Sequence, residues 1–326
     1  MQFRLRRRST STTEWARVDA CRFETASFDH PSRAAVAVGV RSKVMPFIDA
    51  ADGTRIYYAA WGTGTPVILI HGWTTGSDMW EYQLSALTAH GVRCVVYDQR
   101  GCGRSDHPST GYDFDTLADD LAVVVRHLDV NDATFVGFSS GGGVLARYVT
   151  RHGTARVARA VLVSTITPFL LKGTNNPEGL DRSVVYDPFT AGLLNNRAQQ
   201  LADAAPVFFG VGQDGVSVSP EILTWGIGLS RASSALGMIQ LYRAVHETDF
   251  RPDMRGFAMP TLIVHGSADL FVPLQVSAAR THRAIPGSRL EAYEGASHGL
   301  FYTHKTRLNA DLLTFVESEA LLGSRP

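Results

Sequence analysis

The sequence predicts an α/β fold in which a mostly parallel, eight-stranded sheet is flanked by helices and interrupted once by a helical cap. Two observations support this prediction. Short, wholly apolar, β-branched runs such as Pro66–Ile70 are typical of parallel strands that are buried on both faces. These runs alternate with longer segments of helical periodicity, and such alternation is typical of a sheet sandwiched between helices.

The strands are predicted from apolar runs and from turn residues that bound them. A turn at Asp52-Gly53 separates the first two strands and predicts a hairpin. The eight strands are expected at Ile48–Ala51, Arg55–Ala59, Pro66–Ile70, Arg93–Tyr97, Ala133–Phe138, Val157–Ser164, Pro260–His265 and Arg289–Tyr293.

The helices are predicted from apolar residues spaced three and four apart, as at Leu117, Leu121, Val124 and Leu128. Five helices are expected around the sheet, at Trp80–Ala89, Phe114–Leu128, Ser140–Arg151, Leu274–Ile285 and Lys305–Leu322. Residues 168–256 lack buried-strand runs and contain short helical patterns rich in Leu, Phe and Trp. We therefore expect an α/β core at 45–167 and 257–326, with a helical cap at 168–256.

The first 44 residues differ from the rest of the chain because they are rich in Arg, Ser and Thr and have little periodicity. We expect them to be disordered and Met45 to be the working start. An apolar segment does not follow the early arginines at once, as a signal peptide requires, and several acidic residues argue against a transit peptide.

Composition favours a small neutral partner. The chain has 31 basic and 31 acidic residues, so its formal net charge is zero and it has no global attraction for nucleic acid or an anionic membrane. No apolar run approaches the roughly 18 residues that a membrane span needs. The three cysteines, Cys21, Cys94 and Cys102, have neither a disulfide nor a zinc-site pattern, so we expect neither feature, and we expect a cytoplasmic location. Nothing in the sequence indicates an oligomeric state.

The stretch Gly137-Phe138-Ser139-Ser140-Gly141 matches the GxSxG nucleophile elbow and lies between a predicted strand and a predicted helix. The spacing selects Ser139 as the nucleophile, because small residues two positions away on each side let the strand and the helix approach. The alternative, without a catalytic role for Ser139, is a Gly/Ser-rich turn that only connects the two elements. Context disfavours it, since an activated serine needs a base and a carboxylate and both follow in the sequence.

Asp269 and His298 are the candidates for these two roles. Each follows a predicted strand, and the order Ser, Asp, His is the order expected for a nucleophile elbow of this kind. Two competing residues are assigned structural roles: His265 falls inside a strand end and is expected to be packed in the core, and Asp98 begins a polar turn that it is expected to stabilise.

An oxyanion hole is expected from two backbone N–H groups. Ser140 stands at the start of a helix, where the N–H and the helix dipole both favour negative charge, and Trp73 follows a buried strand in the segment His71-Gly72-Trp73-Thr74. His71 is expected to hydrogen-bond the loop backbone, and Cys102 to be inert. Phe138, Trp225 and Phe301 are candidate walls of a substrate pocket, with ordinary core packing as the alternative.

Beyond these motifs, the stretches GTGTPVILIHGW, YDQRGCGRSDHPSTGYDFDTLADDL, VGFSSGGGVLARYV, NPEGL and SHGLF resemble the cofactor-free bacterial haloperoxidase, perhydrolase and esterase group of the α/β-hydrolase family. The resemblance extends from about Phe47 to the last helix. It implies an α/β-hydrolase fold, hydrolysis of small carboxylic esters through an acyl-enzyme on Ser139, Asp269 and His298, and perhydrolysis as a side reaction in which peroxide replaces water. It implies no haem and no metal.

The sequence departs from that group at Thr74, because members noted for halogenation often have proline after the tryptophan. This departure favours plain hydrolysis over perhydrolysis. Two further functions stay open at this stage. The same triad could hydrolyse a lactam or a carbon–carbon bond, or the protein could be a ligand receptor with a hydrolase fold and slow turnover.

Overall fold

The computed structural model describes residues 46–318, so the expected disorder of residues 1–44 lies outside the described part of the chain. Within the described residues, the sheet has eight strands in the order β1-β2-β4-β3-β5-β6-β7-β8. The strands are β1 Phe47–Asp49, β2 Arg55–Trp61, β3 Pro66–Ile70, β4 Arg93–Tyr97, β5 Ala133–Phe138, β6 Val157–Val163, β7 Thr261–Gly266 and β8 Arg289–Tyr293.

Only β2 runs against the other strands. β1 pairs with β2, and β2 with β4, in antiparallel fashion, whereas every later pair in the sheet is parallel. The predicted hairpin and the predicted eight-stranded, mostly parallel sheet are therefore confirmed. All six residues of β5 are buried, as expected for a strand in the middle of a parallel sheet.

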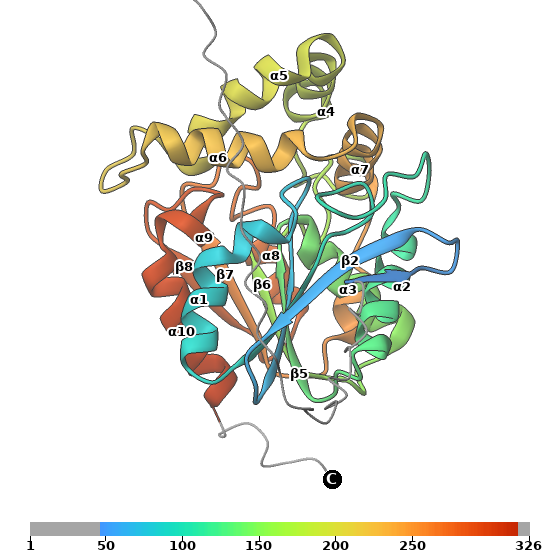
Figure 1. Ribbon diagram of the computed structural model, residues 1–326. Coiled ribbons are helices and arrows are strands. Elements are labelled where there is room, and N and C mark those ends of the chain that lie inside the picture. The colour runs from blue at the N-terminus through green and yellow to red at the C-terminus, as the bar shows by residue number, and fades with distance from the viewer. Residues whose placement is uncertain (1–45, 319–326) are drawn as a thin grey trace, which may run out of the picture. The chain divides into compact units, whose positions relative to one another are not determined.

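Helices cover both faces of the sheet, and successive residues of a strand face different helices. In β3, Ile68 and Ile70 join the cluster of buried side chains that includes α2 and α3, while Val67 and Leu69 join the cluster that includes α1 and α10. Figure 1 shows these two pairs of helices on opposite sides of the sheet. The flanking helices are α1 Glu81–Ala89, α2 Phe114–His127, α3 Ser140–His152, α8 Ala278–Ala284, α9 Leu300–Thr303 and α10 Lys305–Glu317, with short 3₁₀ turns at Ser77–Trp80 and Asp253–Gly256.

Two of the expected helices have different bounds in the structure. The helix predicted from Leu274 begins only at Ala278, because Ser277 has a non-helical backbone (φ −122°, ψ −93°) and its hydroxyl donates to the carbonyl of Pro273. The last helix, α10, begins at Lys305 as predicted but ends at Glu317; the short α9, which the sequence did not predict, precedes it and is separated from it by His304 (φ −118°). The predicted end of that last helix, Leu322, lies outside the described residues.

Four helices stand between β6 and β7, where the sequence predicts the cap. They are α4 Arg182–Val185, α5 Asp187–Phe209, α6 Pro220–Arg231 and α7 Ala235–Glu247. The long α5 is two helical pieces joined at Asn196, whose backbone is not helical (φ −151°, ψ 82°).

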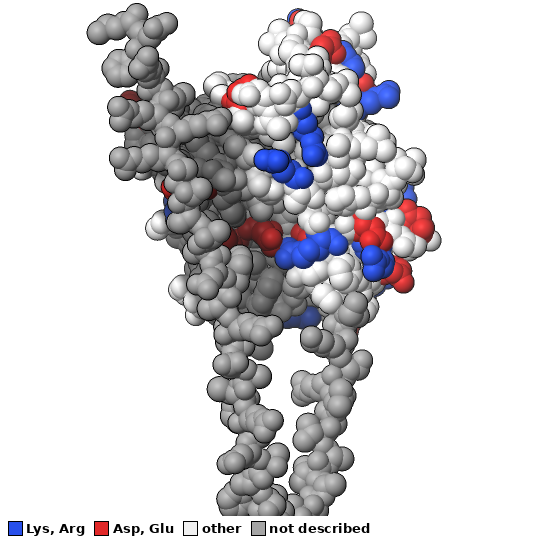
Figure 2. Space-filling model, turned by 45° about the horizontal axis from the view of Figure 1, so that its top comes forward, with Lys and Arg blue, Asp and Glu red and all other residues white. Residues whose placement is uncertain are grey.

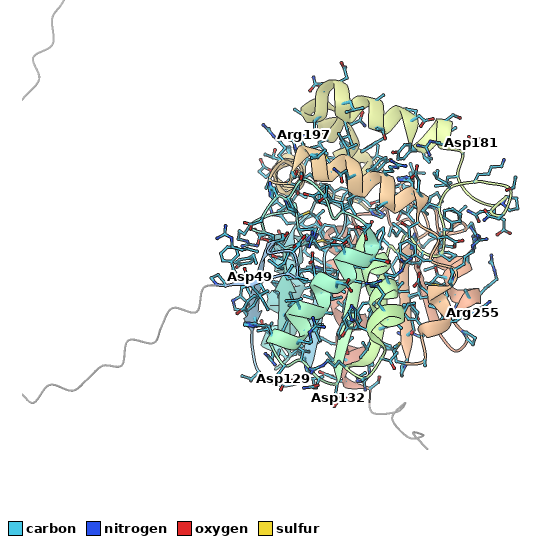
Figure 3. All side chains as sticks on the ribbon, turned by 90° about the vertical axis from the view of Figure 1, so that its right-hand side faces the viewer. Asp49, Asp129, Asp132, Asp181, Arg197 and Arg255 are labelled. Carbon is cyan, nitrogen blue, oxygen red and sulfur yellow. The ribbon has the colours of Figure 1, made fainter. Side chains whose placement is uncertain are left out.

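The cap helices lie over the carboxyl ends of the parallel strands. Figure 3 shows Asp129 and Asp132, which come just before β5, at the bottom of the described structure. It shows Asp181 and Arg197, from the segment between β6 and β7, at the top. Loops that follow β5, β7 and β8 therefore meet the cap, and this edge of the sheet is where ligands bind in open α/β folds.

Candidate active site

Ser139 occupies a strained turn between β5 and α3. Its backbone has φ 52° and ψ −117°, a conformation that costs a non-glycine residue about 1–3 kcal/mol. The glycines on either side make the turn possible. A Cβ at Gly137 would lie 2.5 Å from the carbonyl oxygen of Gly141, and one at Gly141 would strike the carbonyl oxygens of Ile70 and His71. The sequence Gly-x-Ser-x-Gly thus lets strand, turn and helix pack closely with Ser139 at the apex.

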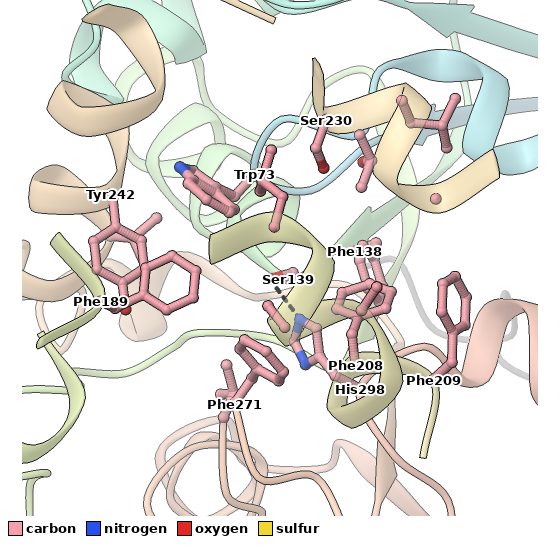
Figure 4. A pocket seen from close by; sticks show the side chains of 18 of the residues that line it. Trp73, Phe138, Ser139, Phe189, Phe208, Phe209, Ser230, Tyr242, Phe271 and His298 are labelled. Carbon is pink, nitrogen blue, oxygen red and sulfur yellow. Dashed lines mark hydrogen bonds between the residues drawn. The ribbon is translucent and has the colours of Figure 1, made fainter. Parts of the chain in front are cut away.

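The structure brings together the three side chains predicted to act in catalysis. His298 Nε2 lies 3.0 Å from Ser139 Oγ, and His298 Nδ1 lies 2.6 Å from Asp269 Oδ2 (Figure 4). Asp269 is in the loop after β7 and His298 in the loop after β8, so both come from strands on the same side of β5. All three residues are buried, with exposed fractions of 3–6%.

Backbone groups hold the carboxylate of Asp269 in place. Its second oxygen, Oδ1, accepts hydrogen bonds from the N–H groups of Phe271 and Val272, each at 2.9 Å. Burial opposes ionisation of this carboxyl group, but the attraction of His298 and these hydrogen bonds outweigh it and hold the pKa of Asp269 below its usual value. An ionised Asp269 only accepts hydrogen bonds, so His298 carries its proton on Nδ1 and presents the lone pair of Nε2 to the Ser139 hydroxyl.

The two predicted oxyanion donors lie beside Ser139. Ser140 is the first residue of α3, and Gly72 brings the Trp73 loop so close that a Cβ at Gly72 would lie 3.1 Å from Ser139 Cβ. Within residues 46–318, neither the N–H of Trp73 nor that of Ser140 donates to any acceptor. Two free N–H groups next to a serine oxygen are the arrangement that stabilises a tetrahedral oxyanion.

The neighbouring polar residues have the structural contacts that the sequence analysis assigned to them. The backbone N–H of Gln99 donates to His71 Nε2 at 2.8 Å, and His71 Nδ1 lies 2.7 Å from the carbonyl of Gly72. Asp98 accepts from the backbone N–H groups of Ser77 and Arg104. Neither residue approaches Ser139 through a hydrogen bond.

His265 and Cys102 are also buried. His265 Nε2 lies 2.7 Å from the Val272 carbonyl and 3.4 Å from Asp269 Oδ2, so it packs behind the carboxylate of Asp269. Burial raises the pKa of the Cys102 thiol to about 12, which leaves it protonated and unreactive near neutral pH.

Thr74 is the position at which the sequence departs from the haloperoxidase and esterase group that it resembles. Its backbone has a conformation that proline cannot adopt. Its φ is 60°, whereas a proline ring restricts φ to about −65°. The Thr74 carbonyl accepts from the hydroxyl of Ser233 at 3.0 Å, and the Thr74 hydroxyl donates to that of Ser230 at 3.2 Å. The cap thereby anchors the loop that bears Trp73.

A cavity adjoins Ser139 between the strand ends and the cap. It holds about 960 Å³ of space not filled by atoms, part of it open to solvent, and is lined mainly by apolar side chains. Phe138, Trp225 and Phe301, the predicted wall residues, all line it, and Phe138 and Phe301 are also packed in the core, with 1% exposure. The sequence analysis did not identify several other walls, which come from the cap and from the Asp269 loop: Phe189, Phe208, Tyr242, Val245, His246 and Phe271. Their helical spacing in the sequence does not distinguish a pocket wall from ordinary core.

The surface shown in Figure 2 has basic and acidic side chains interspersed over its described part, without one large patch of a single sign. Among residues 46–318, no group of three or more His, Cys, Asp or Glu side chains is arranged to hold a metal ion. No helix in this part of the chain is both long and apolar enough to cross a membrane.

The fold and the site together define an α/β protein with a buried Ser–His–Asp arrangement at the carboxyl edge of its sheet. The sequence profile of the alpha/beta hydrolase fold matches residues 65–305, and the chain belongs to that family.

Two relatives and one crystal structure illustrate the likeness. The chain is 42% identical over 277 residues to a non-heme haloperoxidase of Rhodococcus erythropolis, which covers 84% of this chain and 100% of the relative. It is 37% identical over 281 residues to a bifunctional esterase/perhydrolase of Acinetobacter calcoaceticus, with the same coverage. The crystal structure of a bromoperoxidase from Bacillus anthracis superimposes with a TM-score of 0.79 at 38% identity, covering 83% of this chain and all of the other.

Proposed function

We propose that this protein is a serine esterase that hydrolyses small carboxylic esters through an acyl-enzyme on Ser139. The observation that supports it most directly is the continuous chain of contacts from Asp269 Oδ2 through His298 to Ser139 Oγ, at 2.6 Å and 3.0 Å, at the wall of an apolar cavity. The relatives support the same conclusion, since their names combine haloperoxidase, esterase and perhydrolase activities.

In the acylation step, His298 Nε2 takes the proton of the Ser139 hydroxyl while Oγ attacks the ester carbonyl carbon. The carbonyl oxygen becomes an oxyanion that accepts from the N–H groups of Trp73 and Ser140, and the positive end of α3 adds favourable potential. His298 then gives its proton to the leaving alcohol as the carbon–oxygen bond breaks. Asp269 keeps the imidazole oriented and stabilises its transient positive charge.

Deacylation follows the same path with a second nucleophile. Water loses a proton to His298, attacks the acyl carbon and releases the acid and Ser139. Hydrogen peroxide can take the place of water, and the product is then a peracid, which oxidises halide in solution while it is reduced to the acid. We propose hydrolysis as the main reaction and perhydrolysis as a side reaction that needs no cofactor, in line with the names of the relatives.

The alternative functions have less support. The relatives with 37% and 42% identity are named for ester and peroxide chemistry, and these names do not favour a lactam hydrolase, a carbon–carbon bond hydrolase or a ligand receptor. We also propose that residues 168–256 act as a cap unit, and that the protein works in a bacterial cytoplasm. Cys94 and Cys102 are buried free thiols, which suits a reducing compartment.

The proposal is tested by labelling with a fluorophosphonate probe, followed by peptide mass spectrometry, alongside turnover of p-nitrophenyl acetate with and without peroxide. We expect the label on Ser139 and turnover that Ser139→Ala lowers by several orders of magnitude. Ser140→Ala is the matched variant, because it removes the neighbouring hydroxyl but keeps the backbone N–H, and its label should stay on Ser139. Folded protein that takes no label and has no turnover would overturn the proposal.

A further inference from the structure

The cavity has two differently built sides. On one side, which we call the His298 side, the rings of Phe138 and Phe208 pack against the His298 ring with centroids 5.1 Å and 5.2 Å apart. On the other, which we call the Tyr242 side, Tyr242 packs on Trp73 at 5.3 Å and on Phe189 at 4.8 Å. Figure 4 shows Phe189 and Tyr242 on the opposite side of Ser139 from Phe138 and Phe208.

The proposed chemistry assigns the two parts of an ester to these two sides. The leaving alcohol takes a proton from His298 Nε2, so its oxygen must come within hydrogen-bond distance of that atom. The alcohol therefore leaves along the His298 side. The acyl group extends from the carbonyl carbon in the other direction, toward the Tyr242 side.

His246 of α7 is a buried polar residue in the lining of this cavity, with an exposed fraction of 5%. Its Nδ1 lies 2.8 Å from the carbonyl oxygen of Tyr242, one turn earlier in the same helix. A carbonyl oxygen only accepts hydrogen bonds, so the imidazole proton sits on Nδ1. The other ring nitrogen, Nε2, is then left with its lone pair.

That lone pair has no hydrogen-bond partner among the described residues. No group in residues 46–318 donates to His246 Nε2. Several polar side-chain atoms in this part of the chain have neither a partner nor contact with solvent, but Nε2 is not among them, so solvent reaches it. Burial, assisted by the charge of Arg182 and opposed by Glu247, lowers the pKa of His246 to about 4, so the ring is neutral near neutral pH.

Other polar side chains of the lining are already engaged. The Tyr242 hydroxyl donates to the Val185 carbonyl at 2.9 Å, and the Thr75 hydroxyl to the Gly72 carbonyl at 3.3 Å. An all-apolar acyl chain that filled the Tyr242 side would desolvate His246 Nε2 without replacing its hydrogen bond, and such a loss is unfavourable. A chain with a donor at the right position avoids that loss.

We propose that His246 makes the Tyr242 side a subsite for acyl groups that are apolar along most of their length and carry a hydroxyl or N–H donor, which His246 Nε2 accepts. This proposal rests on the proposed esterase function and narrows its substrate class. Because the ring is neutral, the subsite does not favour an acyl group that ends in a carboxylate.

The test compares p-nitrophenyl esters of straight-chain acids of four to eight carbons with esters in which the terminal methyl is replaced by a hydroxyl group. Each pair then has the same number of heavy atoms. The measured quantity is the ratio of kcat/KM for the hydroxy ester to that for the alkyl ester. This ratio is taken on one preparation, so it does not depend on how much of a variant is folded. p-Nitrophenyl acetate, with only a methyl group beyond the carbonyl, reports the proposed function independently.

For the unchanged protein we expect the ratio to peak at one or two chain lengths, because His246 is held at a fixed place in the wall. His246→Phe, which keeps a planar ring, should lower that peak by roughly three- to tenfold, the effect of one neutral hydrogen bond. His246→Gln, which restores an acceptor, should recover part of it. Phe189→Leu, the matched change of an apolar wall residue on the same side, should leave the chain length of the peak in place.

A ratio that is the same in His246→Phe and in the unchanged protein, with acetate still hydrolysed, would overturn the subsite and leave the esterase function standing. Absence of acetate turnover in folded, unchanged protein would overturn the esterase function and the subsite with it.

Discussion

Replacement of Asp269 by asparagine should change the proton on His298 rather than the shape of the site. Asparagine matches aspartate in size, and its amide has one oxygen and one NH₂ group. If the oxygen takes the place of Oδ1, it still accepts from the N–H groups of Phe271 and Val272. The NH₂ group then faces His298 Nδ1, which becomes an acceptor, and the imidazole proton moves to Nε2.

The opposite amide orientation is less stable. It would turn the NH₂ group toward two backbone donors and leave both buried N–H groups unpaired, at a cost of about 1–3 kcal/mol each. With the proton on Nε2, His298 no longer accepts the proton of the Ser139 hydroxyl. Loss of the correct tautomer in a Ser–His–Asp triad lowers kcat about 10⁴-fold, which corresponds to about 5.4 kcal/mol of transition-state stabilisation.

The assay is kcat for p-nitrophenyl acetate together with thermal unfolding. Asp253→Asn is the control, because Asp253 is a similarly buried aspartate that pairs with Arg147 and is not part of the cavity lining. Asp269→Asn should stay folded and lose activity, while Asp253→Asn should lose stability and keep its activity per folded molecule. A kcat for Asp269→Asn within tenfold of the unchanged protein would refute the tautomer argument, and an equal loss in both variants would point to unfolding as its cause.

Three further predictions concern the loop conformations and the acid stability. Thr74→Pro cannot keep φ at 60°, so it should lower the melting temperature and shift the partition between water and peroxide during deacylation; a variant unchanged in both would contradict the role of this loop. Gly141→Ala should destabilise the protein by about 1–3 kcal/mol in urea unfolding, because its Cβ strikes backbone carbonyl oxygens, whereas Gly228→Ala in α6, with open space at its Cβ, should cost far less. Burial raises the pKa of Asp98, but its hydrogen bonds with Arg104 and Ser77 outweigh burial and hold the pKa below its usual value. Asp98 therefore stabilises the fold at neutral pH, and this stabilisation is lost as the pH falls below about 4. The stability difference between the unchanged protein and Asp98→Asn should therefore shrink in acid, and a difference independent of pH would be contrary to this expectation.

Several features of the fold follow from local sequence. Apolar β-branched runs such as Pro66–Ile70 and Ala133–Phe138 became strands within one or two residues of their predicted bounds, since burial on both faces leaves little choice of residue type. Helix ends were less accurate. The start of α8 depends on the backbone angles that Ser277 adopts in response to its surroundings, and residue type alone does not specify those angles.

The candidate site, too, was predicted from the sequence only in part. The glycine spacing around Ser139 and the strand-end positions of Asp269 and His298 are visible in the sequence, because the strained turn and the order of strands constrain which residues can stand there. The sequence also indicated the loop role of His71. It did not indicate that His265, near the end of β7, lies 3.4 Å from the carboxylate of Asp269 in the loop that follows.

The sequence by itself determined the class of fold, and it predicted a candidate nucleophile and the order of its candidate partners, because each of these depends on residue types at short range or at the ends of strongly patterned strands. Only the tertiary structure decided the size and lining of the cavity, the anchoring of Thr74 by Ser233 and the placement of His246 in the pocket wall. These features arise where cap helices more than 40 residues away from Ser139 in the chain pack against the strand ends. An aromatic or histidine residue on an amphipathic helix has the same local pattern whether it faces a filled core or an open cavity, so its role is settled by packing across the fold.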